Sequence, residues 1–319
     1  MEAYCIGLFA EFEFYLVRAK GDRMRRNDID VYKGILVWLV VISHIMAVSV
    51  NLYNTILFRV IVNSHIPLFL GVSGYLFKPE KFKVRKSVQR LIFPWCIANL
   101  VYFVLSGQSV SVRGLLFGFE THLWYIPSLI LFMTLLWLVE KMHFKKVIYV
   151  VLIVVAFAFQ FPGLLVGEGI AVKTIRFLVS NFRLQFLIYF LLGNMLRKTG
   201  ITRQYKKLTV AIAGGIVFLL LAAVTTDKAC IAFKLVGNTA LMAGLLQNVV
   251  TISENSRVLN FLKLSGRNSM FIYLYHVIPL ILPFTNLLKI VITVVWGAVM
   301  VIVICKKNDS GLWYLLGLN

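Results

Sequence analysis

Two ionisable residues in one apolar segment are spaced so that both can act on the same substrate. Lys33 and His44 lie in the segment 31–50, with ten residues between them. In an α-helix, this separation of 11 positions corresponds to three turns plus about 20°, which places both side chains on one face, roughly 16 Å apart along the axis. Because ionisable groups are costly to bury in a membrane span, such a pair indicates a functional site.

The chemistry of this pair fits acyl transfer to a hydroxyl group. Histidine is suited to general-base catalysis because its unperturbed pKa is near neutrality. His44 would remove the proton from a hydroxyl that attacks an acyl carbon, and Lys33 would bind the phosphates of an anionic donor. The structural alternatives are a histidine that is hydrogen-bonded between helices and a lysine that extends to the lipid headgroups.

Two further histidines are predicted at a similar depth in the membrane. His65 lies roughly 13 Å into the apolar segment 56–77 and His276 roughly 12 Å into the segment 268–285, in a hydrocarbon core about 30 Å thick. Tyr273 precedes His276 by three positions and lies on the same helical face. Three histidines at one level suggest a buried site, and the alternative for each is again a hydrogen bond between helices.

Basic and aromatic residues that flank other apolar segments are candidates for substrate contacts. Arg90 ends a basic cluster in 78–90 and enters the next apolar segment, so it could bind a nucleotide phosphate. The alternative is an ordinary basic loop on the cytoplasmic side. His122 and Trp124 lie at the start of the segment 123–140, at the outer face of the membrane, where they could contact an acceptor. Trp124 could also simply anchor the helix at the membrane interface.

The composition is that of a polytopic membrane protein. Of the 319 residues, 60% are hydrophobic and 14% are charged, and the mean hydropathy is +0.86, whereas soluble domains contain about 25% charged residues. The net charge of +20 would suggest a nucleic-acid partner, but the basic residues form short clusters between apolar segments, as the positive-inside rule predicts. The four cysteines stand at no metal-ligand spacing. We therefore expect neither nucleic acid nor a metal ion as a partner.

Ten apolar segments predict an all-α fold of about ten transmembrane helices. Of the 33 Lys and Arg residues, 24 fall in the N-terminal segment and in alternate loops, among them 257–267, and 8 fall on the opposite side, which predicts that both termini are cytoplasmic. The predicted regions are an N-terminal extension 1–23 that need not be structured, a membrane domain 24–305 and a short cytoplasmic tail 306–319. The predicted spans are 31–50, 56–77, 88–107, 123–140, 146–162, 184–197, 208–225, 231–250, 268–285 and 286–305.

In these motifs the chain resembles the integral-membrane acyltransferase family 3, especially its branch of fucose acetylases and other glycan O-acetyltransferases. The signature of that family is Arg or Lys, then ten residues, then His, and Lys33 and His44 match it. The resemblance covers about residues 24–305, and the other matching segments follow in the family's order. They are His65-Ile-Pro-Leu-Phe, Ser73-Gly74-Tyr75-Leu-Phe, Arg90-Leu-Ile-Phe-Pro94, His122-Leu-Trp124-Tyr125, Phe190-Leu-Leu-Gly193-Asn-Met-Leu and Gly266-Arg-Asn268-Ser269-Met-Phe-Ile-Tyr273-Leu-Tyr-His276.

The resemblance implies a multi-pass protein of the bacterial inner or plasma membrane that transfers an acyl group, usually acetyl from acetyl-CoA, to a sugar hydroxyl. The acceptor would be a cell-surface polysaccharide or its lipid-linked precursor. His44 would be the catalytic base and Lys33 its signature partner. We expect Lys33 and Arg90 to bind the donor. We expect the substrate to be contacted by His65, Tyr75, His122, Trp124, Tyr273 and His276.

A transporter or flippase for a lipid-linked glycan is the alternative function. In such a protein, Lys33 and the mid-membrane histidines would form a path for substrate or protons. Transporters of this kind carry broken helices in two matching halves, whereas the segment 56–77, which contains Pro67 and two glycines, has no counterpart in the chain. A purely structural role would leave the pairing of Lys33 with His44 without a purpose.

Overall fold

The described part of the chain is built from helices. The computed structural model describes residues 26–106, 122–161, 167–199, 205–247 and 256–306, together with Trp313 and residues 315–318. The predicted extension 1–23 and most of the predicted tail 306–319 lie outside these residues. In chain order the helices are α2 (Asn27–Val48), α3 (Ile56–Leu76), η2 (Pro79–Lys81), α4 (Val84–Ser106), η3 (His122–Trp124), α6 (Tyr125–Lys141), α7 (Lys145–Ala158), α8 (Ile170–Asn181), η5 (Leu184–Phe186), α9 (Leu187–Thr199), α10 (Tyr205–Val224), α11 (Asp227–Gln247), α12 (Arg257–Arg267), α13 (Ser269–Tyr275), α14 (Ile278–Ile281) and α15 (Asn286–Lys306).

The chain is a multi-pass membrane protein of the all-α class, as predicted. Within the described ranges, α2, α3, α4, α6 with the preceding η3 turn, α11 and α15 are the six helices long and apolar enough to cross a membrane, and the pair formed by α8 and η5–α9, bent by 65°, could supply a seventh span. Helices also occupy the other predicted spans. However, α7 has only 14 residues, and the apolar stretches 209–224 and 269–281 are likewise shorter than the ~20 residues that a straight span needs.

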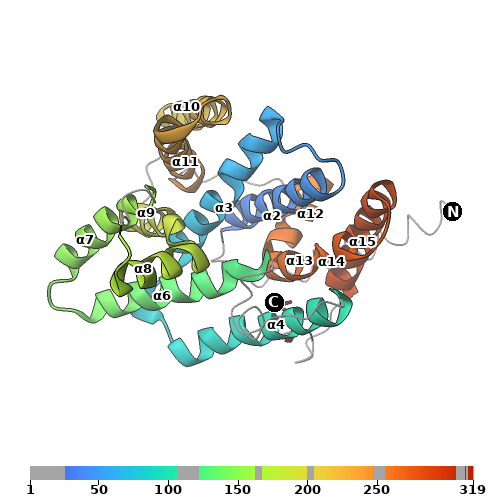
Figure 1. Cartoon of the computed structure of the whole chain (residues 1–319), viewed down its shortest axis with the longest axis horizontal. Coiled ribbons are helices and arrows are strands. Elements are labelled where there is room, and N and C mark those ends of the chain that lie inside the picture. The colour runs from blue at the N-terminus through green and yellow to red at the C-terminus, as the bar shows by residue number, and fades with distance from the viewer. Residues whose placement is uncertain are drawn as a thin grey trace.

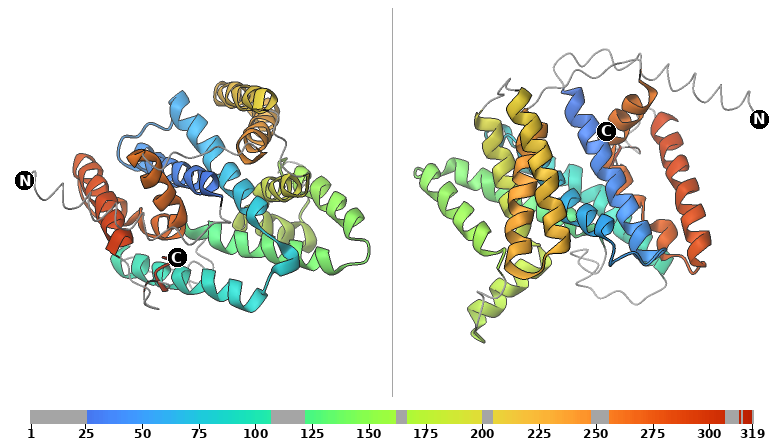
Figure 2. Two further views of the ribbon diagram at one scale, coloured as in Figure 1. Left: turned by 180° about the vertical axis from the view of Figure 1, so that it is seen from behind. Right: turned by 90° about the horizontal axis from the view of Figure 1, so that it is seen from above.

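Helices α2 and α3 form the centre of the molecule (Figure 1). The paired helices α10 and α11 lie on one side of them, and α12, α13 and α15 lie on the other (Figures 1 and 2). Helices α4 and α6 cover a third side (Figure 1). The segment 107–121 between α4 and the η3 turn that precedes α6 is outside the described residues. Because α2 contacts α3, α12 and α13, its residues are held by several neighbours at once.

Glycines allow the central helices to approach each other at backbone distance. A Cβ atom on Gly34 of α2 would lie 2.0 Å from the carbonyl oxygen of Leu262 in α12, and one on Gly74 of α3 would lie 2.0 Å from the carbonyl oxygen of Phe190 in α9. Small residues at helix crossings are the usual means of tight packing in membranes, where van der Waals contact replaces the hydrophobic effect. The positions of α2 and α3 are therefore fixed by close contacts with α12 and α9.

Helix α12 occupies a segment that we expected to be a loop. The Ser256 side chain caps it by accepting a hydrogen bond from the Leu259 amide. Its buried face carries the polar residues Asn260, Lys263 and Ser265, whereas Val258 is 67% exposed. A helix with its polar face inside and its apolar face outside is suited to a membrane environment, and the polar residues in it hide it from a search for apolar runs.

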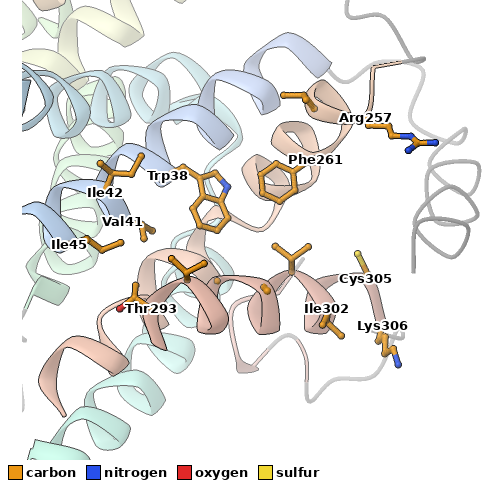
Figure 3. Close-up of a pocket in the computed structure, with 15 residues that line it drawn as sticks. Trp38, Val41, Ile42, Ile45, Arg257, Phe261, Thr293, Ile302, Cys305 and Lys306 are labelled. Carbon is orange, nitrogen blue, oxygen red and sulfur yellow. The ribbon is translucent and has the colours of Figure 1, made fainter. Parts of the chain in front are cut away.

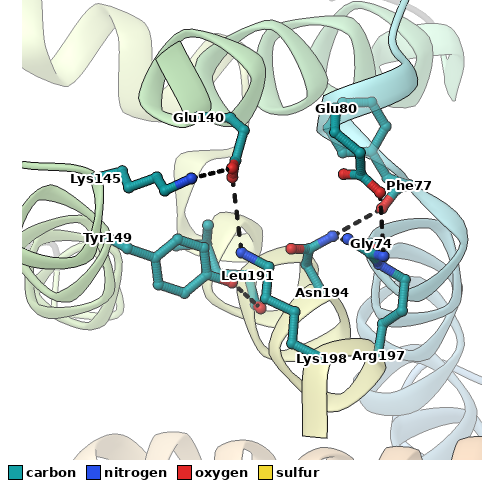
Figure 4. A network of polar contacts seen from close by, with 10 residues as sticks. All are labelled: Gly74, Phe77, Glu80, Glu140, Lys145, Tyr149, Leu191, Asn194, Arg197 and Lys198. Atoms are coloured by element: carbon teal, nitrogen blue, oxygen red, sulfur yellow. Dashed lines mark hydrogen bonds and ion pairs between the residues drawn. The ribbon is translucent and has the colours of Figure 1, made fainter. Parts of the chain in front are cut away.

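A polar network ties together the ends of α3, α6 and α9 (Figure 4). Glu140 of α6 forms ion pairs with Lys145 at 2.6 Å and with Lys198 of α9 at 3.9 Å. The side-chain amide of Asn194 in α9 donates hydrogen bonds to the carbonyl oxygens of Gly74 and Phe77, at 3.0 and 2.9 Å. The ends of α3 and α6 are thus both tied to α9.

Candidate active site

Three histidines from three distant parts of the chain meet in the interior. His44 comes from the last turns of α2, His122 from η3, and His276 from the end of α13. The ring centroids of His44 and His276 are 4.9 Å apart, those of His122 and His276 5.1 Å, and those of His44 and His122 5.8 Å. His276 is completely buried. These are three of the histidines that the sequence singled out, so the fold joins them into one cluster.

In two of the three rings, a hydrogen bond to a carbonyl group indicates which nitrogen carries the proton. His44 Nδ1 lies 2.9 Å from the Val40 carbonyl oxygen, and His276 Nδ1 lies 2.9 Å from the Tyr273 carbonyl oxygen. Because a carbonyl only accepts, we assign a proton to Nδ1 in both rings. The Nε2 atoms then carry the lone pairs. His276 Nε2 lies 3.4 Å from His44 Nδ1. The Nδ1 hydrogen of His44 can therefore form a bifurcated hydrogen bond to the Val40 carbonyl oxygen and to His276 Nε2.

Tyrosines hold the third histidine in place. The Tyr273 hydroxyl donates a hydrogen bond to the carbonyl oxygen of His122. The Tyr102 hydroxyl donates to the Leu274 carbonyl oxygen at 2.9 Å and lies 3.4 Å from His122 Nε2. The Trp95 indole nitrogen donates to the Leu123 carbonyl oxygen at 3.1 Å. Side chains from α4 and α13 therefore fix the short η3 turn and aim His122 at the other two histidines.

A cavity of about 470 Å³ lies beside this cluster, and its lining includes Tyr273 but none of the three histidines. It lies between α2, α3, α4, α6 and α13. Its lining includes the aromatic and hydroxyl side chains of Phe69, Ser73, Tyr125 and Tyr273. The rings of Tyr125 and Tyr273 are 5.4 Å apart, and Tyr273 in turn contacts His122 and His276 with centroid distances of 5.7 and 6.2 Å. The basic residues that line the cavity are Lys33, Lys78, Lys81, Arg90 and Arg267.

The cavity is lined by Lys33, Arg90 and Tyr273, which the sequence predicted as site residues, and by Arg267, which was not predicted as one. Arg267 ends α12 and pairs with Asp30 at a Nε–Oδ2 distance of 3.2 Å. Its guanidinium also donates to the Asn27 side chain at 3.1 Å. Because we expected the segment around Arg267 to be a cytoplasmic loop, only the packing of α12 against α2 reveals that this cation borders the cavity.

Two predicted substrate contacts, His65 and Tyr75, are not members of the three-histidine cluster, although His65 interacts electrostatically with His44. His65 is buried, and its Nδ1 lies 2.6 Å from the Ile61 carbonyl oxygen of its own helix. The Tyr75 hydroxyl accepts a hydrogen bond from Arg26 at 2.9 Å, and the Arg26 guanidinium lies 5.7 Å from the Tyr75 ring centroid. Arg26 also donates to the Leu246 carbonyl oxygen, so Arg26 links the start of α2 to Tyr75 of α3 and to α11. A role of either residue in substrate binding stays a prediction.

Trp124 belongs to an aromatic surface that the sequence did not reveal as a whole. Its ring stacks on Phe186 at a centroid distance of 5.6 Å, and the Arg183 guanidinium lies 5.8 Å from the Trp124 ring centroid. Arg183 has a φ of 48° and a ψ of 48°, a left-handed conformation that is uncommon for residues other than glycine and often occurs at functional sites. This aromatic surface adjoins His122, which is two residues from Trp124.

The described residues do not bring three or more His, Cys, Asp or Glu side chains into an arrangement that could hold a metal ion. The chain matches the acyltransferase 3 family, described as an acyltransferase domain, over residues 26–305. The comparisons with curated proteins and with solved structures gave no match. The family match includes all the helices that contribute to the histidine cluster and to the cavity.

Proposed function

Because the chain belongs to the acyltransferase 3 family, we propose that it is a membrane O-acetyltransferase that moves acetyl from acetyl-CoA to a hydroxyl of a carbohydrate. The observation that carries this proposal is the cavity that extends from five basic side chains to Tyr273, which contacts the histidine cluster. A membrane acyltransferase needs such a path to bring a water-soluble, highly charged donor to a base inside the bilayer.

The basic opening of the cavity suits the phosphates of coenzyme A. Lys33, Arg90 and Arg267 come from three different helices and line the same space. Lys and Arg bind phosphate through charge-assisted hydrogen bonds, which are stronger than those between neutral groups. With the phosphates at these cations, the acetyl end of the donor would extend past Tyr125 and Tyr273 toward the histidines. The positive-inside rule then orients this opening to the cytoplasm, together with both termini.

His44 is the base in this proposal, and His276 orients it. His44 Nε2 takes the proton of the acceptor hydroxyl as its oxygen bonds to the acetyl carbon. The carbon–sulfur bond of the thioester then breaks, and the proton passes from His44 to the sulfur, which yields coenzyme A and the acetyl ester. His276 Nε2, 3.4 Å from His44 Nδ1, accepts a hydrogen bond from the imidazolium and stabilises its charge, a role that carboxylates fill in other catalytic dyads.

The aromatic surface of Trp124, Phe186 and Arg183 is the proposed acceptor side. Trp124 is two residues from His122, whose ring contacts that of His44. Aromatic rings and a cation offer the apolar faces and hydrogen-bond donors that a sugar requires. The acceptor is then a cell-surface polysaccharide or its lipid-linked precursor, as the sequence resemblance implies.

The direct test is acetyl transfer by the purified full-length chain in lipid nanodiscs. Acetyl-CoA labelled in the acetyl group is supplied together with a glycan extract, and both coenzyme A release and label in the glycan are measured. We expect both products from the wild type and neither from His44→Gln, with similar thermal stabilisation of the two proteins by acetyl-CoA. Binding of acetyl-CoA by neither protein, or equal label with both, would overturn the proposal.

A further inference from the structure

A second cavity lies against α2 and contacts different residues of that helix from those that line the first cavity (Figure 3). It has a volume of about 660 Å³ and lies between α2, α12 and α15. On α15 it extends from Thr293 to Lys306, 13 positions, which corresponds to roughly 20 Å of helix. Its walls are almost entirely apolar, with Trp38, Ile42 and Ile45 on α2 facing the helix α15. We refer to it as the α15 groove.

Fixed side chains form the walls of the α15 groove. The Trp38 indole nitrogen donates to Ser265 Oγ at 3.1 Å, and its ring stacks on Phe261 at a centroid distance of 5.6 Å. On the facing wall, Gly297 has no side chain, and a Cβ atom there would be 3.4 Å from the Trp38 ring. The width of the groove therefore depends on Gly297, and a larger side chain at this position would fill it.

The surroundings of the α15 groove are apolar and face outward. Val258 is 67% exposed, Val294 64% and Ile42 42%, whereas α12 turns its polar residues inward. Exposure of such a surface is unfavourable in water but not in hydrocarbon. In the membrane, lipid chains surround this face, and an open groove of roughly 20 Å, longer than the ~15 Å of one leaflet, can hold the length of one of them.

Both charged residues of the α15 groove lie at the same end and are basic. Arg257 begins α12 and Lys306 ends α15, and Figure 3 shows both at the end opposite to Ile45 and Thr293. None of the residues that line the groove is acidic. Basic residues at the end of an apolar groove complement the phosphate of an anionic lipid and contribute about 1 kcal/mol each at an anionic membrane surface.

We propose that the α15 groove is a binding site for an anionic glycerophospholipid, with one acyl chain along α15 and the phosphate at Arg257 and Lys306. The bound chain completes the contact between α15 and α2, which otherwise meet through few residues. Because α2 carries Lys33 and His44, the lipid would hold the helix that bears the catalytic pair. The proposal rests on the groove and its charges and does not depend on the identity of the acyl donor or acceptor.

Native mass spectrometry and thermal unfolding of the full-length chain in detergent test this proposal. The probes are dioleoyl phosphatidylglycerol and dioleoyl phosphatidylcholine, which share their chains and differ in net charge. We expect one tightly bound phosphatidylglycerol and a rise in melting temperature that phosphatidylcholine does not match. The double variant Arg257→Gln/Lys306→Gln should bind phosphatidylglycerol about 25-fold more weakly, since each cation accounts for about fivefold.

A second pair of variants tests the place of the acyl chain. Gly297→Leu fills the α15 groove and should abolish binding of the lipid, whereas Val299→Leu, which is not in the groove lining, should leave it unchanged. Equal binding of both lipids by the wild type, or retention of phosphatidylglycerol by the double variant, would overturn the proposal even if Gly297→Leu fails to fold. Preferential binding of a polyprenyl phosphate would also overturn it, because the site would then serve a lipid carrier.

Discussion

The Nε2 atom of His276 lies 3.4 Å from Nδ1 of His44, and the same Nδ1 lies 2.9 Å from the carbonyl oxygen of Val40. The hydrogen on Nδ1 is thus oriented by two acceptors, one from its own helix and one from α13. This arrangement leaves Nε2 of His44 as the basic nitrogen. This contact between residues separated by 232 positions supports the proposal that His44 is the base and His276 its orienting partner.

Removal of the orienting histidine should lower the rate of transfer but not donor affinity. We expect His276→Leu to reduce kcat about 10- to 100-fold, by analogy with the loss of a partner that orients a metal-binding histidine, with an unchanged KM for acetyl-CoA. In His276→Gln, the amide oxygen can accept the hydrogen of His44 Nδ1, so this variant should keep more activity. Steady-state kinetics of coenzyme A release measures both. Equal activity of the Leu and Gln variants would contradict the orienting role.

Loss of the Lys33 charge should weaken binding of the donor through its phosphates. Lys33→Met should raise the KM for acetyl-CoA about 10- to 100-fold, because a charge-assisted hydrogen bond contributes about 1.5–3 kcal/mol. Lys33→Arg, which keeps the family signature, should retain most of the affinity. Acetyl-pantetheine, which lacks the nucleotide phosphates, provides the control: wild type and Lys33→Met should use it equally well. A larger effect of the substitution on acetyl-pantetheine would place Lys33 at the reacting groups instead.

Substitution of the aromatic surface should affect the acceptor alone. Trp124→Ala should raise the KM for the glycan up to about tenfold, which corresponds to the loss of about 1.5 kcal/mol of aromatic contact, and should leave the KM for acetyl-CoA unchanged. Trp124→Phe preserves the stack on Phe186 and should remain close to wild type. Kinetics with each substrate varied in turn distinguishes these outcomes, and a rise in the KM for acetyl-CoA would show that this surface is not on the acceptor side.

The crossing of α2 and α12 should be sensitive to a single methyl group. Gly34→Ala places a Cβ atom 2.0 Å from the Leu262 carbonyl oxygen, and such overpacking typically costs about 1–3 kcal/mol. Gly214→Ala in α10 is the matched control, because its Cβ atom would meet nothing within 4 Å, and alanine is the better helix former by about 1 kcal/mol. Melting temperatures in detergent should fall for the first variant and stay level or rise for the second. Equal melting temperatures of the two variants would mean that α2 and α12 can move apart without loss of stability.

The sequence predicted the helices and residues that depend on local patterns. Apolar runs located α2 and α3, and the spacing of Lys33 and His44 placed both on one face of α2. A common depth was predicted for His44, His65 and His276, whereas His122 was expected at the outer face of the membrane. The meeting of His122 with the end of α13 depends on tertiary contacts such as that of Tyr273 with the His122 carbonyl. Depth alone also included His65, which is not one of the three clustered rings.

Three features could not be predicted because their cause lies outside the local pattern. Helix α12 was not predicted because its buried face is polar, whereas in soluble proteins the buried face of a helix is apolar. With it, the position of Arg267 at the cavity was missed. The 65° bend between α8 and the η5–α9 unit occurs where Arg183 is left-handed, and no glycine or proline marks it. The sidedness of the termini is still a prediction from the distribution of basic residues.

The central claim is that His44 acts as the base of glycan O-acetylation, and one measurement tests it most directly. His44→Ala and the wild type are expressed to equal levels in a deletion strain, and base-labile O-acetyl groups are quantified on the purified surface polysaccharide. We predict that the acetyl groups are lost in His44→Ala while the polysaccharide is made and exported in normal amount. Unchanged acetylation together with reduced export would contradict the account and would favour a flippase.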